Sequence, residues 1–129
     1  MEFIRKLKFD KNGLIPCIIQ DYRSGEVLML AYMNEESLKK TVRNGKTCFW
    51  SRSRKKFWVK GETSGNIQKL EEIRFDCDND ALLMKVRQTG GACHNGYRSC
   101  FHNVIDRKGK VRRTGSKIFD PEKVYGKKI

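Results

Sequence analysis

Hydrophobic and polar positions alternate along most of the chain, and this pattern predicts short strands rather than long helices. Two apolar runs, at residues 14–20 and 27–33, are typical of buried strands, and the polar segment 21–25 between them predicts a turn. The same alternation predicts further strands at residues 47–52, 57–60, 67–75, 81–89 and 99–105.

One segment departs from this alternation. Asn34 stands before two glutamates, which is typical of a helix N-cap, and Gly45 is a stop signal, so we expect a helix at 35–42. One short helix among about seven strands predicts an α+β domain that is mostly β, with barrel-like antiparallel sheets and one or two short helices. The 129 residues fit a single domain over residues 1–129, in which 106–129 form a basic C-terminal extension of open role.

The charge balance narrows the choice of partner. The chain carries 28 Lys and Arg against 15 Asp and Glu, a net charge of +13. Such a surface favours an anionic partner, which can be nucleic acid, an acidic membrane or a phosphorylated small molecule; a solvated basic surface is the alternative. The N-terminal segment lacks the apolar core of a signal peptide, so we expect a cytoplasmic protein. Five cysteines, an odd number, favour metal binding or burial over disulfides there.

Three aspartates, Asp76, Asp78 and Asp80, alternate around Cys77. If this segment is extended, the three carboxylates share one side and the thiol faces the other. Carboxylates that converge repel one another unless a hard cation lies between them. The spacing therefore predicts a Mg²⁺ site, and a solvated acidic turn is the alternative.

Cys77, Cys93 and Cys100 form a second candidate ligand set. Three soft ligands leave one coordination position for water, which is the arrangement of a catalytic zinc. The other two cysteines, Cys17 and Cys48, lie among apolar residues in predicted strands, so we expect them in the core.

His94 directly follows one of these cysteines, and it can be a fourth zinc ligand or a general base. Adjacent residues of an extended segment point to opposite sides, which favours the role of base. For His102 we expect a half-buried position on a strand.

Basic and aromatic residues alternate at 49–60, and a hydroxyl-rich segment follows at 61–66. Arginine forks and hydroxyl donors bind phosphate, and Trp50 and Trp58 can stack on a base. Single-stranded nucleic acid would use the same features, and a basic hairpin with core tryptophans is the other alternative. Because the donors are concentrated in one segment beside a candidate catalytic metal, we favour a phosphorylated small molecule over nucleic acid.

Five motifs in order resemble those of phosphoribosyl-AMP cyclohydrolase in its monofunctional form. They are LAYMN at 30–34, WSRSR at 50–54, WVKGETSGN at 58–66, DCDNDALL at 76–83 and GGACHNGYRSCF at 90–101. The resemblance implies an intertwined homodimer with zinc and magnesium at the subunit interface. It implies one Zn²⁺ per subunit, held by Cys77 of one chain with Cys93 and Cys100 of the other. Asp76, Asp78 and Asp80 would hold Mg²⁺.

The resemblance also implies a substrate and a reaction. The substrate would be N1-(5-phosphoribosyl)-AMP, whose adenine ring is opened by hydrolysis in histidine biosynthesis, with His94 as general base or proton shuttle. Phosphate and ribose groups would be held by Ser51, Arg52, Ser53, Arg54, Trp58, Lys60, Glu62, Thr63 and Ser64. Many relatives are fused to a pyrophosphohydrolase domain, and we expect this chain to rely on a separate enzyme for that step. The competing hypotheses are a zinc-stabilised RNA-binding module and a protein with a purely structural zinc.

Overall fold

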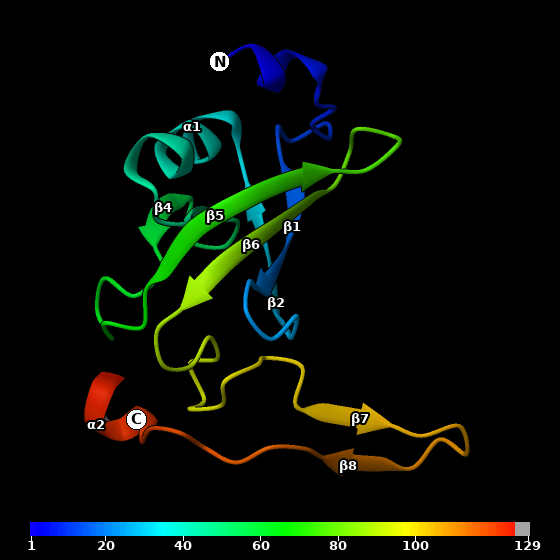
Figure 1. Ribbon diagram of the computed structural model, residues 1–129, viewed down its shortest axis with the longest axis vertical. Helices are drawn as coiled ribbons and strands as arrows, with labels where there is room; N and C mark the ends of the chain where they lie inside the picture. The colour runs from blue at the N-terminus through cyan, green and yellow to red at the C-terminus, as the bar shows by residue number, and fades with distance from the viewer. Residues whose placement is uncertain (126–129) are drawn as a thin grey trace.

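The computed structural model describes residues 1–125, and its largest element is an open four-stranded sheet of order β2-β1-β6-β5 (Figure 1). The strands are β1 (Ile15–Asp21), β2 (Val27–Met33), β5 (Gln68–Phe75) and β6 (Leu82–Gln88). The outer pairs β1–β2 and β5–β6 are antiparallel, but the central pair β1–β6 is parallel. The predicted antiparallel pairing is therefore found in every strand pair except this central one. The long connection from β1 to β6 leaves room for the crossover that a parallel pair needs.

The sheets do not close into a barrel within residues 1–125. Two separate hairpins accompany the main sheet: β3 (Cys48–Ser51) pairs with β4 (Lys56–Val59), and β7 (Asn103–Ile105) pairs with β8 (Val111–Arg113). The predicted barrel is therefore wrong, because β2 and β5 remain edge strands. The broader prediction of a mostly β fold with short helices is confirmed.

The helix α1 (Glu35–Asn44) begins at the predicted residue and extends two residues beyond the predicted end, up to the predicted stop at Gly45. The side chain of Asn34 accepts the N–H of Ser37 at 2.8 Å, and the Ser37 hydroxyl accepts the N–H of Asn34 at 3.0 Å. This reciprocal pair satisfies two donors that the helix itself cannot. Gly45 ends the helix in the left-handed region at φ 70°. A 3₁₀ helix, η1 (Glu2–Lys6), and a short helix, α2 (Pro121–Tyr125), lie near the ends of the chain.

The core lies on one face of the main sheet, between the sheet, α1 and the β3–β4 hairpin. Cys17 and Cys48 are buried, as predicted. The largest fully buried apolar side chains are Phe49, Ile15, Ile19, Leu28, Met33, Leu38, Leu82, Met84 and Val86.

The opposite face of the sheet is apolar but uncovered in the single chain. Ile18 of β1 is 38% exposed and pairs with Leu30 of β2, which is 46% exposed. On its other side Ile18 pairs with Leu83 of β6. A contiguous apolar face of this kind marks a contact surface.

The C-terminal part differs from the prediction in detail. Only Asn103–Ile105 of the predicted strand 99–105 is a strand, because 99–102 follow the loop before it. The basic extension after Asp106 contains β8 and α2. The last four residues of the predicted extension, 126–129, lie outside the described residues. No helix within residues 1–125 is long and apolar enough to cross a membrane.

Candidate metal and substrate site

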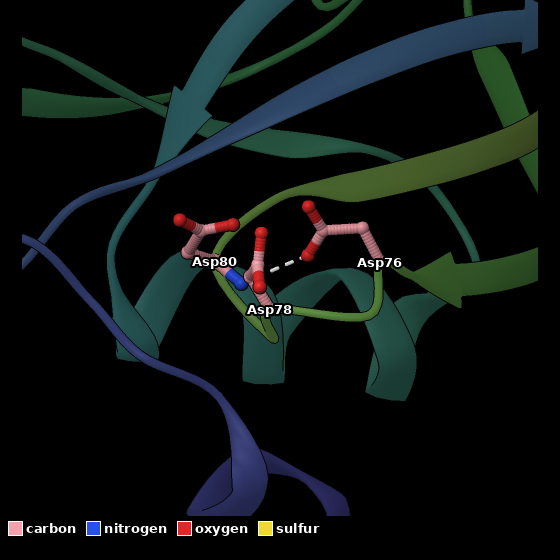
Figure 2. Close-up of side chains that lie close together, drawn as sticks. All are labelled: Asp76, Asp78 and Asp80. Atoms are coloured by element: carbon pink, nitrogen blue, oxygen red, sulfur yellow. Dashed lines mark hydrogen bonds between the residues drawn. The ribbon is translucent and has the colours of Figure 1, made fainter.

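Asp76, Asp78 and Asp80 lie on the loop that joins β5 to β6, and their carboxylates converge (Figure 2). One oxygen from each lies within 4.8 Å of the others. The segment is a tight turn and not the extended stretch that we expected. A carboxylate oxygen of Asp76 accepts the N–H of Asp80 at 3.0 Å, and Asn79 adopts φ 62°. The convergence is therefore produced by a hydrogen-bonded turn, since alternation along a strand is absent here.

The electrostatics of this turn favour a cation. Partial loss of hydration, the hydrogen bond with Asp76 and the charges of Asp76 and Asp78 together raise the pKa of Asp80. The pKa of Asp76 is lowered, chiefly because the backbone N–H of Asp80 donates to it. Three exposed carboxylates this close repel one another, and oxygen ligands are those that Mg²⁺ prefers. The donor set fits a hard divalent cation.

The three candidate zinc ligands do not meet within one chain. Within residues 1–125, the aspartate cluster is the only group of three or more acidic, histidine or cysteine side chains close enough to hold an ion. Cys77 is exposed on the β5–β6 turn, before β6, whereas Cys93 and Cys100 follow β6 (Figure 1). A strand of this length spans roughly 23 Å. A site built from all three thiols therefore requires a second chain.

Cys93 and Cys100 themselves are close together. Burial, followed by the neighbouring Cys93 thiol, raises the pKa of Cys100 to about 12. Cys93 is 3% exposed and lies in a narrow turn, in which its N–H donates to the carbonyl of Tyr97 at 3.1 Å and its carbonyl accepts the N–H of Gly96 at 3.0 Å. Two thiols are thus held side by side in the same chain.

The two histidines differ in environment. His94 is exposed at the tip of this turn while its neighbour Cys93 is buried. The two adjacent residues therefore differ in burial. The segment that carries them is a turn and not the extended stretch from which their opposite orientation was predicted. His102 is half-buried and stacks on Tyr97, with ring centroids 3.9 Å apart and planes inclined by 13°. His102 does not lie on a strand, so that part of the prediction is wrong.

Lys60 is a buried cation next to the cysteine pair. It is 6% exposed, and no carboxylate among residues 1–125 lies within ion-pair distance of it. Burial lowers the pKa of Lys60, while Cys100 and Cys93 act in the opposite direction. Its ammonium nitrogen lies 5.9 Å from the centre of the Trp58 ring. Lys60 therefore lies close both to the ring of Trp58 and to the thiols of Cys93 and Cys100.

A pocket of about 620 Å³ lies between β2 and the β3–β4 hairpin. Four of the predicted substrate-binding residues line it, namely Ser51, Arg52, Ser53 and Trp58. Trp50 and Tyr32 line it too. The guanidinium carbon of Arg52 lies 4.0 Å from the centre of the Tyr32 ring. Tyr32 was not predicted as a site residue. The available signal was its place in the LAYMN motif at 30–34.

The remaining predicted substrate residues lie outside this pocket. Arg54 is exposed at the hairpin turn, and Glu62 and Thr63 are exposed on the following loop, beside the half-buried Ser64. This loop contacts residues 90–100, the segment that carries Cys93 and Cys100. The amide oxygen of Asn66 lies so close to Gly90 that a Cβ on Gly90 would overlap it. The loop therefore packs against the start of the cysteine segment.

Comparison with known proteins agrees with these features. The family model for phosphoribosyl-AMP cyclohydrolase matches residues 29–102. A phosphoribosyl-AMP cyclohydrolase of Pelotomaculum thermopropionicum is 59% identical over 122 residues, covering 95% of each chain. That of Chlorobium phaeovibrioides is 52% identical over 126 residues, covering 98% of this chain and 92% of the relative. That of Chloroherpeton thalassium is 56% identical over 122 residues, covering 94% of this chain and 87% of the relative.

Proposed function

This chain belongs to the phosphoribosyl-AMP cyclohydrolase family of hydrolases, and we propose that it opens the adenine ring of N1-(5-phosphoribosyl)-AMP in L-histidine biosynthesis. The bond hydrolysed is that between ring nitrogen 1 and carbon 6, and the product is the formimino-aminoimidazole-carboxamide ribonucleotide. The observation that carries this proposal is the convergence of three carboxylates within 4.8 Å on a turn that also carries an exposed thiol.

Two metals are part of the proposal. Asp76, Asp78 and Asp80 would hold Mg²⁺, in keeping with their all-oxygen donor set. Cys77 would hold Zn²⁺ together with Cys93 and Cys100 of the partner subunit, because these thiols lie at opposite ends of β6 within one chain. Bound zinc supplies water activation, since it lowers the pKa of water toward neutrality.

The uncovered face of the sheet supports a homodimer. Ile18 and Leu30 expose apolar surface next to one another, and a groove of about 240 Å³ continues from this face to Asp76. Phe75 and Leu83 line the groove. A second copy that covers this face would remove apolar surface from water.

The pocket beside Tyr32 is suited to a phosphorylated nucleotide. Trp50 and Trp58 offer stacking surfaces for a base, and Arg52 with the hydroxyls of Ser51 and Ser53 offers donors to phosphate. The substrate carries two phosphate groups, which agrees with the net charge of +13. The dense donors and the enclosing aromatics favour one small ligand.

His94 is the residue that we assign to proton transfer. Water adds to carbon 6 and the bond from carbon 6 to nitrogen 1 breaks, so that carbon 6 becomes the carbonyl carbon of a carboxamide. Of the two protons of water, one goes to nitrogen 1 and the other to the exocyclic nitrogen on carbon 6. His94 would accept the first of these protons from water and return it to nitrogen 1, so that the balance needs only one water molecule. His94 is exposed and lies next to Cys93, one of the proposed zinc ligands.

A ring-opening assay tests this proposal. Phosphoribosyl-AMP is mixed with metal-loaded protein, with and without a zinc chelator, and the absorbance change of ring opening is followed. We expect turnover that the chelator abolishes. Cys93→Ala should lose turnover, whereas Cys48→Ala should keep it, although Cys48 is a buried thiol as well. An absence of turnover from metal-loaded dimeric protein would contradict the proposal.

A further inference from the structure

Residues 113–121, from the end of β8 to the start of α2, form a C-terminal arm that lies against the loop that carries Cys93 and Cys100. The N–H of Thr114 donates to the carbonyl of His102 at 2.8 Å, and the N–H of Ile118 donates to the carbonyl of Gly96 at 2.7 Å. Figure 1 shows this C-terminal segment running alongside the loop that follows β6. The two hydrogen bonds fall at residues 96 and 102, on either side of Cys100.

Side chains add to these backbone contacts. Tyr97 is 7% exposed, and its ring stacks on His102. Arg113 of β8 lies on the same ring, 5.9 Å from its centre, and donates a hydrogen bond of 3.4 Å to the Tyr97 hydroxyl. The carbonyl of Tyr97 is the acceptor for the N–H of Cys93. The arm thus contacts the residue that closes the turn around Cys93.

Two glycines of the loop show how closely the arm approaches. A Cβ on Gly91 would lie 3.1 Å from Ile118 and 3.2 Å from the ring of Phe119. A Cβ on Gly96 would overlap the carbonyl oxygen of Phe119 and lie 3.3 Å from Pro121. Glycine at these two positions is what allows the arm to pack directly on the backbone of the loop.

The arm contributes little to the rest of the fold. Within residues 101–125 no side chain is buried, and the main core contains none of them. The loop at 90–100, for its part, has no helix or strand of its own and contains three glycines, so holding it in one conformation is entropically costly. The contacts of the arm therefore act on this loop in particular.

We propose that residues 113–121 form a brace that positions Cys93 and Cys100 for metal binding. This inference rests on the proposed zinc site, and it concerns residues outside the part matched by the family model. The brace is a positioning element that acts through the loop. Without it, the two thiols would sample many separations, and a metal ion would have to order the loop when it binds.

A matched pair of glycine substitutions in the full chain tests the brace. Gly96 and Gly115 both have positive φ, 95° and 75°, so alanine is strained at each, but nothing lies within 4 Å of a Cβ on Gly115. We expect Gly96→Ala to weaken zinc binding about tenfold or more, measured by competition with a chromogenic chelator, and Gly115→Ala to stay within about twofold of wild type. Phe119→Ala, which removes the ring over Gly91, should also weaken binding.

A second readout does not depend on zinc. In metal-free protein, the buried Cys93 should react faster with a thiol reagent in Gly96→Ala and Phe119→Ala than in wild type or Gly115→Ala. If wild type binds no zinc, the zinc site is wrong, and the thiol rates alone decide on the brace. Wild-type zinc affinity and wild-type thiol rates in both variants would overturn it. If circular dichroism shows that Gly96→Ala does not fold, the zinc affinity and thiol rate of Phe119→Ala test the brace alone, because Phe119 is only half-buried.

Discussion

One carboxylate oxygen of Asp76 accepts the N–H of Asp80 at 3.0 Å and that of Ala81 at 3.3 Å, so a candidate metal ligand also closes the turn that presents it. Asp76→Asn keeps an acceptor at this position but removes the charge. We expect Mg²⁺ affinity, measured by titration calorimetry, to fall about tenfold or more, with little change in melting temperature. Asp76→Ala should lower both, because the turn then loses its acceptor as well.

Asp106 provides the control for this effect. Its carboxylate accepts the N–H groups of Lys108 and Lys110 at 2.8 and 3.0 Å in a similar turn, but it belongs to no acidic cluster among the described residues. Asp106→Asn should leave Mg²⁺ binding unchanged. Equal losses of affinity in the two asparagine variants would show that the cluster is not the binding site.

Lys60 should have opposite effects on the metal-free and zinc-bound states. A buried ammonium group without a carboxylate partner destabilises the metal-free fold, whereas three thiolates and Zn²⁺ carry a net negative charge that this cation offsets. We expect Lys60→Met to raise the melting temperature of the metal-free protein and to weaken zinc binding about tenfold. Lys40→Met is the control, because Lys40 is exposed and lies over Phe57, 4.8 Å from the ring centre. If Lys60→Met raised or lowered both the melting temperature of the metal-free protein and the zinc affinity, this account of the Lys60 charge would be refuted.

The local parts of this fold could be predicted, and the long-range parts could not. The strand at Val27–Met33 and the cap at Asn34 follow from periodicity and from a single side chain, which are properties of a few neighbouring residues. The parallel pairing of Ile19 with Met84 depends on how a long connection crosses the sheet, and no local pattern encodes it. For that reason the parallel pair at the centre of the sheet was not predicted.

The site shows the same division. The convergence of the aspartates was predicted from alternation, but the structure produces it by a turn in which Asp76 binds the backbone of Asp80. Alternation and a tight turn can both bring residues i, i+2 and i+4 together, so the sequence could not distinguish them. Tyr32 was missed because the signal is a long-range contact, in which Tyr32 on β2 meets Arg52 in the turn between β3 and β4.

Asp21 should make stability sensitive to acid. Burial alone would raise the pKa of Asp21, but hydrogen bonds from Ser24 and Gln88 and the Arg98 guanidinium at 3.0 Å outweigh it and lower the pKa. A lowered folded-state pKa means that this stabilisation is present above the unfolded value of about 4 and is lost as pH falls through the folded value. We expect Asp21→Asn to cost roughly 1–3 kcal/mol of unfolding free energy at pH 7, by urea titration, and progressively less below about pH 4.

Asp10 serves as the comparison for Asp21. It lies in an exposed turn, where it accepts the N–H groups of Asn12 and Leu14 and has no cationic partner within ion-pair distance among residues 1–125. Asp10→Asn should cost less unfolding free energy at pH 7, because Asp10 is exposed and lacks the ion pair. A deficit in Asp21→Asn that stays constant from pH 7 to pH 3 would contradict the assignment of the acid sensitivity to this carboxylate.

Arg52 should affect substrate binding more than turnover. Its guanidinium lies over Tyr32 and faces the pocket, and lysine cannot reproduce either the stacking or the forked donors. We expect Arg52→Lys to raise KM about tenfold with a small change in kcat, measured in the ring-opening assay. Arg43→Lys, at the exposed end of α1, should match wild type. A fall in kcat at unchanged KM would remove Arg52 from the binding role.

The arrangement of the three cysteines can be tested by mixing two inactive variants. Cys77 stands before β6, while Cys93 and Cys100 stand after it, so we expect Cys77→Ala and Cys93→Ala each to lack zinc and turnover. When the two are unfolded together and refolded, about half of the dimers should be mixed, and each mixed dimer carries one complete site of two. Zinc content and turnover should then return to about a quarter of wild type. Mixing Cys93→Ala with Cys100→Ala is the control. In the proposed arrangement each site takes both of these cysteines from one chain, so every site of every dimer in this mixture lacks one of them. Recovery in that control, or none in the first mixture when both variants dimerise, would show that the site is not shared between chains.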